Sequence, residues 1–184
     1  MAKESLIMKA LREDYVSMSL DIENTCKKTD ILLKIYRKVS WSAKESFDEL
    51  NEITYESCMS ATEHLCYLLN FAPDKELGVF ERRAVSAMQT RVLVELIERA
   101  AVKLKEYPDN GSVYYSIIEL KYLGYFHYTE GEILEQLNME RSNYYRKHRE
   151  AKMLMGYVLF GLIMPDYVNE KQQSGATKMR QKCD

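Results

Sequence analysis

The side chains best suited to binding a polyanion gather in one short stretch, residues 141–152. Five cations stand there against the single anion Glu150: Arg141, Arg146, Lys147, Arg149 and Lys152. Ammonium and guanidinium groups neutralise phosphates, and a guanidinium group also matches the acceptor edge of guanine. The residue types therefore indicate a surface that could bind duplex DNA, although a solvated helix face explains a charge cluster equally well.

Uncharged hydrogen-bonding side chains lie among these cations. The amide of Asn143 matches the edge of adenine, and we assign a guanine contact to Arg141 or Arg146. The other three cations are the expected phosphate contacts. The candidate DNA-binding residues are Arg141, Ser142, Asn143, Tyr145, Arg146, Lys147, Arg149 and Lys152.

Two adjacent tyrosines receive different interpretations. Tyr144 shares a helix face with the apolar positions that should meet Ile133 and Leu137, so we expect it in the core. Tyr145 could lie on the DNA backbone, contact a thymine methyl group, or be an ordinary half-buried tyrosine. The sequence does not choose among these three.

A short helix and a tight turn must position this stretch. Thr129 followed by Glu132 forms the pattern of a capping box, which predicts that a helix begins there. Residues 138–140 form the turn, and a second helix is expected to begin near Arg141. This is the spacing of a helix-turn-helix, whose second helix lays its first residues in the major groove.

Catalytic and metal chemistry are not indicated. The sequence contains no carboxylate pair, Ser/His/Asp set or phosphate-cradling glycine loop, so we expect neither an enzyme nor a cofactor. A zinc site is not expected, because the cysteines form no CxxC pair and the histidines are far apart: Cys26, Cys58, Cys66, Cys183, His64, His127 and His148.

Composition predicts an all-α protein. Only 3 Pro and 7 Gly interrupt 184 residues, of which 46% are hydrophobic and 29% charged. The net charge of −2 gives no overall attraction to nucleic acid, so binding must depend on local charge.

Residues 1–11 do not resemble a signal peptide, and the apolar run 153–164 is shorter than the roughly 20 residues that span a bilayer. A cytoplasmic protein without a membrane segment is expected.

Residues 1–108 are expected to form long helices. A heptad-like stripe predicts a helix over 3–39 with a weak joint near Lys28. Ser40-Trp41-Ser42 is a candidate N-cap for a second helix ending near Asn70, and a third helix is expected over 75–107. Their narrow apolar seams could form an antiparallel bundle, a coiled-coil arm that pairs two chains, or both.

The rest of the chain is expected to hold the helix-turn-helix. Residues 107–112 combine a proline with an Asn-Gly turn, so we place a domain boundary at residue 108. A helix over 112–123, stopped by Gly124, should complete a domain of residues 109–168. Residues 169–184 are polar without an apolar face, which predicts a disordered tail.

Residues 114–161, YYSIIELKYLGYFHYTEGEILEQLNMERSNYYRKHREAKMLMGYVLFG, resemble the sigma-70 region 4 type of helix-turn-helix. More narrowly, they are similar to phage-encoded transcriptional regulators of the ArpU and RinA kind. The chain departs from that pattern at Glu140, where a Ser or Thr is usual, and in lacking a small Ala after Ile133.

The resemblance implies a regulator of phage or prophage late genes that binds double-stranded DNA. It implies RNA polymerase as a further partner, and the N-terminal seams favour a homodimer. The alternative is a helical adaptor protein whose apolar run 153–164 docks a protein partner.

Overall fold

A computed structural model of the chain describes residues 6–47, 55–71, 77–89 and 91–180. Every regular element in these residues is helical, which confirms the all-α prediction. In chain order they are α1 Leu6–Ser17, α2 Ile22–Phe47, α3 Tyr55–Asn70, α4 Leu77–Gln89, α5 Val92–Lys105, α6 Gly111–Ile118, the π-helical turn η1 Glu119–Leu123, α7 Glu130–Gln136, α8 Arg141–Gly156, the π-helical segment η2 Tyr157–Ile163, and α9 Met164–Arg180.

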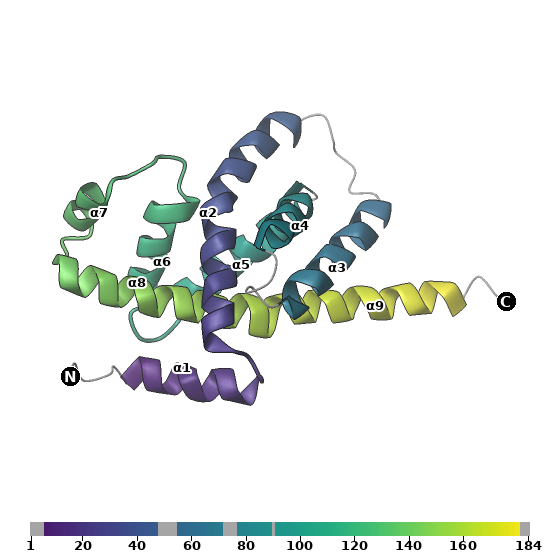
Figure 1. Cartoon of the computed structure of the whole chain (residues 1–184), viewed down its shortest axis with the longest axis horizontal. Helices are drawn as coiled ribbons and strands as arrows, with labels where there is room; N and C mark the ends of the chain where they lie inside the picture. The colour runs from purple at the N-terminus through teal and green to yellow at the C-terminus, as the bar shows by residue number, and fades with distance from the viewer. Residues whose placement is uncertain (1–5, 48–54, 72–76, 90, 181–184) are drawn as a thin grey trace.

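The longest feature is the uninterrupted helical run α8–η2–α9, which lies along the long axis of the molecule (Figure 1). Helix α2 crosses this run, α6 and α7 lie at one end of it, and α3 packs against α9 (Figure 1). The stretch Arg141–Gln173 contains an 18-residue window apolar enough to cross a bilayer by composition, but 61% of that window is buried inside the protein. Such burial is what a core helix shows, so the window is weak evidence for a membrane span.

A glycine brings α2 and the α8–η2 run into close contact. A Cβ atom on Gly156 would lie 2.7 Å from Thr29 Oγ1 and 2.9 Å from the Tyr15 hydroxyl. That hydroxyl donates a 2.8 Å hydrogen bond to the carbonyl oxygen of Met153. Gly156 thus allows α1 and α2 to dock on the run that continues from the candidate DNA-binding stretch.

The predicted joint near Lys28 is wrong. The chain turns instead at residues 18–21, where Ser19 has a φ of 54° and the Asp21 carboxylate accepts a bond from the amide of Asn24. The ammonium of Lys28 is buried and donates to the carbonyl oxygens of Leu68 and Leu69, 3.0 and 2.8 Å away. A cation at the C-terminal end of α3 satisfies carbonyls that the helix leaves free, which explains a lysine inside the apolar stripe.

Two other predicted helix boundaries need correction. Ser40-Trp41-Ser42 lies inside α2 and caps no helix, whereas the end of α3 at Asn70 is confirmed. The predicted third helix is two helices, because Arg91 adopts a left-handed conformation (φ 64°) between α4 and α5. The apolar stripe of the predicted third helix is nevertheless buried from Phe80 in α4 to Leu104 in α5. The part of the predicted second helix at residues 48–54, and residues 75–76 and 90 of the predicted third helix, lie outside the described residues.

One hydrophobic core spans the predicted boundary at residue 108. The turn there contains Asn110 with a φ of 62°, and Leu104 before it and Ile118 after it belong to the same buried cluster. The N-terminal stripe is therefore buried within a single chain, and pairing with a second chain stays a prediction.

Beyond residue 168 the structure differs from the expected disordered tail, since α9 continues to Arg180. Extending a helix that is already formed requires no new nucleation.

Candidate nucleic-acid interface

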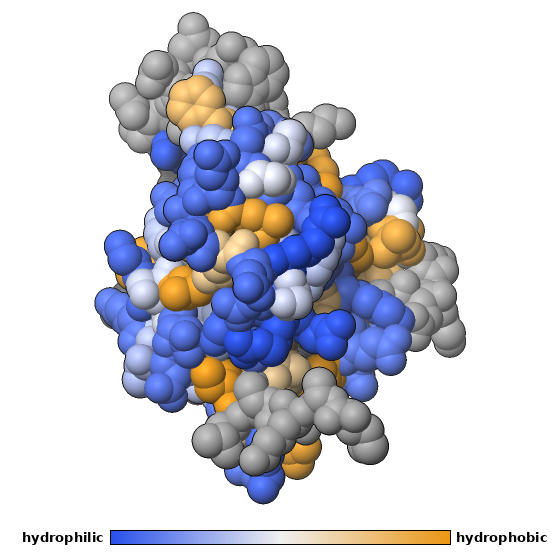
Figure 2. Space-filling model, turned by 90° about the vertical axis from the view of Figure 1, so that its left-hand side faces the viewer, coloured by the Kyte–Doolittle hydropathy of each residue, from blue (hydrophilic) through white to orange (hydrophobic). Residues whose placement is uncertain are grey.

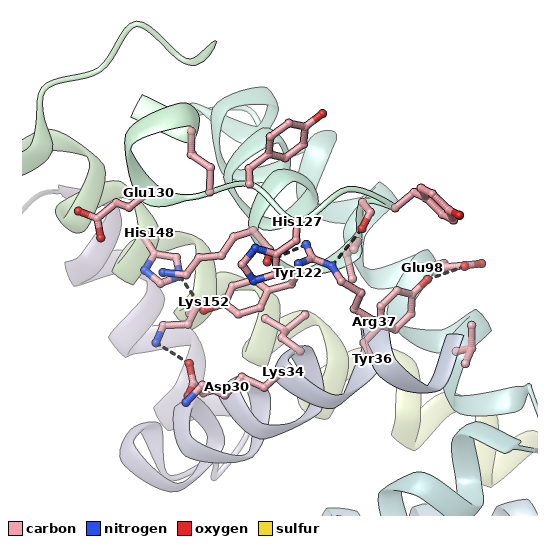
Figure 3. Close-up of a pocket in the computed structure, with 18 of the residues that line it drawn as sticks. Asp30, Lys34, Tyr36, Arg37, Glu98, Tyr122, His127, Glu130, His148 and Lys152 are labelled. Carbon is pink, nitrogen blue, oxygen red and sulfur yellow. Dashed lines mark hydrogen bonds and ion pairs between the residues drawn. The ribbon is translucent and has the colours of Figure 1, made fainter. Parts of the chain in front are cut away.

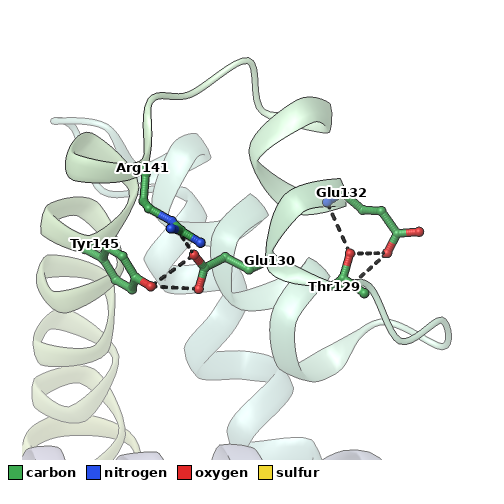
Figure 4. Close-up of polar contacts among 5 residues, drawn as sticks. All are labelled: Thr129, Glu130, Glu132, Arg141 and Tyr145. Carbon is green, nitrogen blue, oxygen red and sulfur yellow. Dashed lines mark hydrogen bonds and ion pairs between the residues drawn. The ribbon is translucent and has the colours of Figure 1, made fainter.

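Helix α7 begins at the predicted capping box. The Thr129 hydroxyl accepts a 3.4 Å bond from the Glu132 amide, and the Glu132 carboxylate accepts a 2.6 Å bond from the Thr129 amide (Figure 4). Behind α7, a small separate core joins it to α6 and α8 through Ile117, Ile133 and Tyr144. Tyr144 is fully buried there, which confirms its assignment to the core.

The turn between α7 and α8 lies where the sequence predicted it. Asn138 takes a left-handed conformation (φ 47°), and the Met139 amide donates to the Leu134 carbonyl oxygen at 3.0 Å. Helix α8 then begins at Arg141, with Glu140 as an N-cap residue whose side chain makes no capping bond. The N-terminal end of α8 lies at one end of the molecule (Figure 1).

One face of α8 is exposed and carries most of the candidate residues. At about 100° per residue, positions 141, 142, 145, 146 and 149 fall within about 140° of one another. These are the exposed residues at the start of α8, and they are Arg141, Ser142, Tyr145, Arg146 and Arg149. Hydrophilic side chains dominate this end of the molecule (Figure 2). We call these five residues the α8 face.

An acidic residue of α7 holds two residues of the α8 face. The carboxylate of Glu130 accepts a 3.0 Å bond from Arg141 Nε and bonds of 2.8 and 3.0 Å from the Tyr145 hydroxyl (Figure 4). These bonds lower the pKa of Glu130, the Tyr145 hydroxyl having the largest effect, so the carboxylate remains charged at neutral pH. Glu130 therefore occupies donors that an approaching phosphate would use.

Two of the predicted phosphate contacts do not belong to the α8 face. Lys147 is 8% exposed; its ammonium lies 3.4 Å from the buried carboxylate of Glu150 and 5.2 Å from the ring centre of Tyr114. Lys152 is partly buried and forms a 3.0 Å ion pair with Asp30 of α2. Because both ammonium groups already face carboxylates inside the fold, we remove both residues from the candidate set.

Asn143 is half-buried at the edge of the α8 face. Its side-chain oxygen accepts a 2.6 Å bond from Arg146, whose guanidinium also lies 3.2 Å from Glu150. An adenine contact by Asn143 would therefore require Arg146 to turn away. Arg149 is exposed and forms no ion pair with the residues described.

The inner side of α8 contains an aromatic stack that the sequence interpretation missed. The ring of His148 is parallel to the ring of Tyr144, with centroids 5.7 Å apart, and its Nε2 lies 3.0 Å from the Tyr122 hydroxyl. Burial, helped by the charges of Lys121 and Lys152, lowers the pKa of His148 to about 3, so its imidazole is neutral. The i, i+4 spacing of Tyr144 and His148 was the available signal, but the partner Tyr122 comes from a distant turn.

Comparison of the chain with protein-family models, curated proteins and solved structures finds no match.

Proposed function

We propose that the protein binds duplex DNA through the α8 face and acts as a transcriptional regulator. The carrying observation is that three arginines, a serine and a tyrosine project together from the first turns of a helix that follows a capped helix and a tight turn. Arginine side chains supply both phosphate neutralisation and guanine recognition.

The resemblance to ArpU and RinA regulators supports the narrower part of the proposal. By that resemblance the target genes are late genes of a phage or prophage, RNA polymerase is a partner, and the protein acts in the cytoplasm. If two chains pair, their recognition helices should contact half-sites about 34 Å apart on a near-palindromic operator.

Selection of bound fragments from a random DNA pool tests the proposal directly, because it reports binding, sequence preference and half-site symmetry together. We expect enrichment of a defined motif. With one arginine at a guanine and two neutralising phosphates, the log-log dependence of affinity on salt should have a slope of about −2 per chain. An unenriched pool, or a complex insensitive to salt, would contradict the proposal.

A matched pair of arginine substitutions separates the α8 face from general charge effects. Arg149→Ala removes an exposed guanidinium from this face, and Arg99→Ala removes an exposed guanidinium from α5. DNA affinity should fall in the first variant and stay near that of the parent protein in the second. Equal losses would show that the interaction is not localised on α8.

An adaptor protein is the second candidate. The apolar run 153–164 no longer supports it, because most of that run is buried in the core. A different observation favours it: Tyr125 and Phe126, 73% and 64% exposed, form an edge-to-face pair on the loop before α7. Exposed aromatic residues are frequent at protein interfaces. An adaptor would leave the DNA pool unenriched, so the same selection discriminates the two.

A further inference from the structure

A large cavity lies beside the candidate interface, between α2, α5, η1, the loop before α7, and α8 (Figure 3). Its volume is about 1160 Å³, somewhat above the roughly 300–1,000 Å³ of typical small-molecule pockets, and it is open to solvent on one side. Arg37 fixes one wall, because its guanidinium donates to the carbonyl oxygens of Gly124, Leu120 and Lys121 at 2.9–3.3 Å. The cavity is thus formed by ordered elements.

One end of the cavity has more positive than negative charge. Asp30 is shared by two ammonium groups, those of Lys34 at 2.5 Å and Lys152 at 3.0 Å. A third ammonium, that of Lys121, forms no ion pair with the described residues and lies 5.7 Å from the ring centres of Tyr122 and Tyr144. Burial and the nearby Lys152 lower the pKa of Lys121, while the carboxylates of Glu130 and Asp30 act in the opposite direction. With Glu130 counted in the lining, three ammonium groups face two carboxylates. An incoming anion would relieve this imbalance.

The same end has an aromatic lining and an unsatisfied polar group. Tyr122, Tyr144 and neutral His148 all line the cavity. The hydroxyl of Tyr144 is buried and has no hydrogen-bond partner among the described residues. Buried polar groups are normally hydrogen-bonded, so the unpartnered Tyr144 hydroxyl is a spare donor and acceptor in a residue that lines the cavity.

We propose that this cavity binds a small planar aromatic carboxylate. Its carboxylate group accepts from the Lys121 ammonium at the end shared with Asp30, Lys34 and Lys152. Its ring lies against the aromatic lining, and the Tyr144 hydroxyl supplies a further hydrogen bond. The proposal requires no DNA binding and is tested without DNA.

Calorimetric titration of the full chain tests the ligand class. The probes are 2-naphthoate, its neutral analogue 2-naphthamide, and inorganic phosphate. We expect saturable binding of one 2-naphthoate per chain, with the amide and phosphate each at least about tenfold weaker. No saturable binding of 2-naphthoate would overturn the proposal. Equal binding of the amide would show an apolar site, and equal binding of phosphate would show a simple anion site; either result overturns it.

Three variants assign the binding to this cavity. Lys121→Met should weaken 2-naphthoate binding at least about tenfold, whereas Lys9→Met, on an exposed lysine of α1, should leave it unchanged. Tyr144→Phe should weaken binding several-fold and raise the melting temperature of the free protein, because it removes an unsatisfied hydroxyl. Weaker binding together with a higher melting temperature in Tyr144→Phe would exclude misfolding as the cause of the weaker binding. Unchanged affinity in both Lys121→Met and Tyr144→Phe would overturn the assignment.

Discussion

Glu130 and Arg141, the first residues of α7 and α8, are joined across the turn between the two helices by a 3.0 Å ion pair. The arginine side chain is 72% exposed, so it is accessible to solvent even while it is paired. Exposed ion pairs are weak. Under the proposed function, a DNA phosphate would replace the Glu130 carboxylate as the partner of Arg141.

If the α8 face binds DNA as proposed, Glu130→Gln should increase DNA affinity about two- to fivefold, because it frees Arg141 and removes a negative charge from the proposed interface. Fluorescence anisotropy with a labelled duplex at low salt measures the change. Glu135→Gln removes an exposed carboxylate from the other end of α7 and is the matched control. An equal gain in both variants would attribute the effect to net charge alone.

Gly156→Ala should lower the free energy of unfolding by about 1–3 kcal/mol, since the added methyl group would overlap Thr29 and Tyr15 at the crossing of α2. Gly131→Ala is the control, because a Cβ atom at that exposed position of α7 meets no atom within 4 Å. It should raise stability by up to about 1 kcal/mol through helix propensity. Urea denaturation measures the change in the free energy of unfolding in both variants. A stabilising Gly156→Ala would contradict the close packing of Gly156 against Thr29 and Tyr15.

Thr129→Ala should cost about 1 kcal/mol of stability by removing the capping box of α7, whereas Thr129→Ser keeps a hydroxyl and should cost much less. Hydrogen exchange is the more specific measurement, because loss of the cap should speed exchange of the α7 amides before it affects α5. Uniform acceleration throughout the protein would indicate a global effect instead.

The buried His148 predicts a stability that falls in acid. Its pKa is depressed from 6.5 to about 3 in the folded protein, so between these values the unfolded chain binds a proton that the folded chain does not. The contribution of neutral His148 to the free energy of unfolding is therefore complete above pH 6.5 and is lost as the pH falls toward 3. From pH 7 to pH 5 this loss is at most about 2 kcal/mol.

The double variant Tyr122→Phe, His148→Phe removes this titration without leaving the Tyr122 hydroxyl unpaired. Urea denaturation of the parent protein and the variant at pH 7 and pH 5 isolates the contribution of His148 from that of the carboxylates. The parent protein should lose more stability than the variant. Parallel losses would show that His148 is readily protonated in the folded state.

The N-terminal helices show where sequence patterns lead to wrong boundaries. The heptad-like stripe correctly marked buried positions such as Leu11, Leu32 and Tyr36, but the same apolar spacing can continue from one helix into the next across a turn. The breaks at Ser19 and Arg91 use left-handed conformations of residues that do not commonly adopt them. Neither break has a Gly or Pro signal.

The sequence alone determined the features whose causes lie within a few residues of one another. The capping box at Thr129, the turn at Asn138 and the start of α8 at Arg141 all follow from local hydrogen bonding and backbone preference, and all are confirmed. Only the tertiary structure decided which cations of α8 are available. Lys152 meets Asp30 from 122 residues away, and no local pattern encodes that pairing.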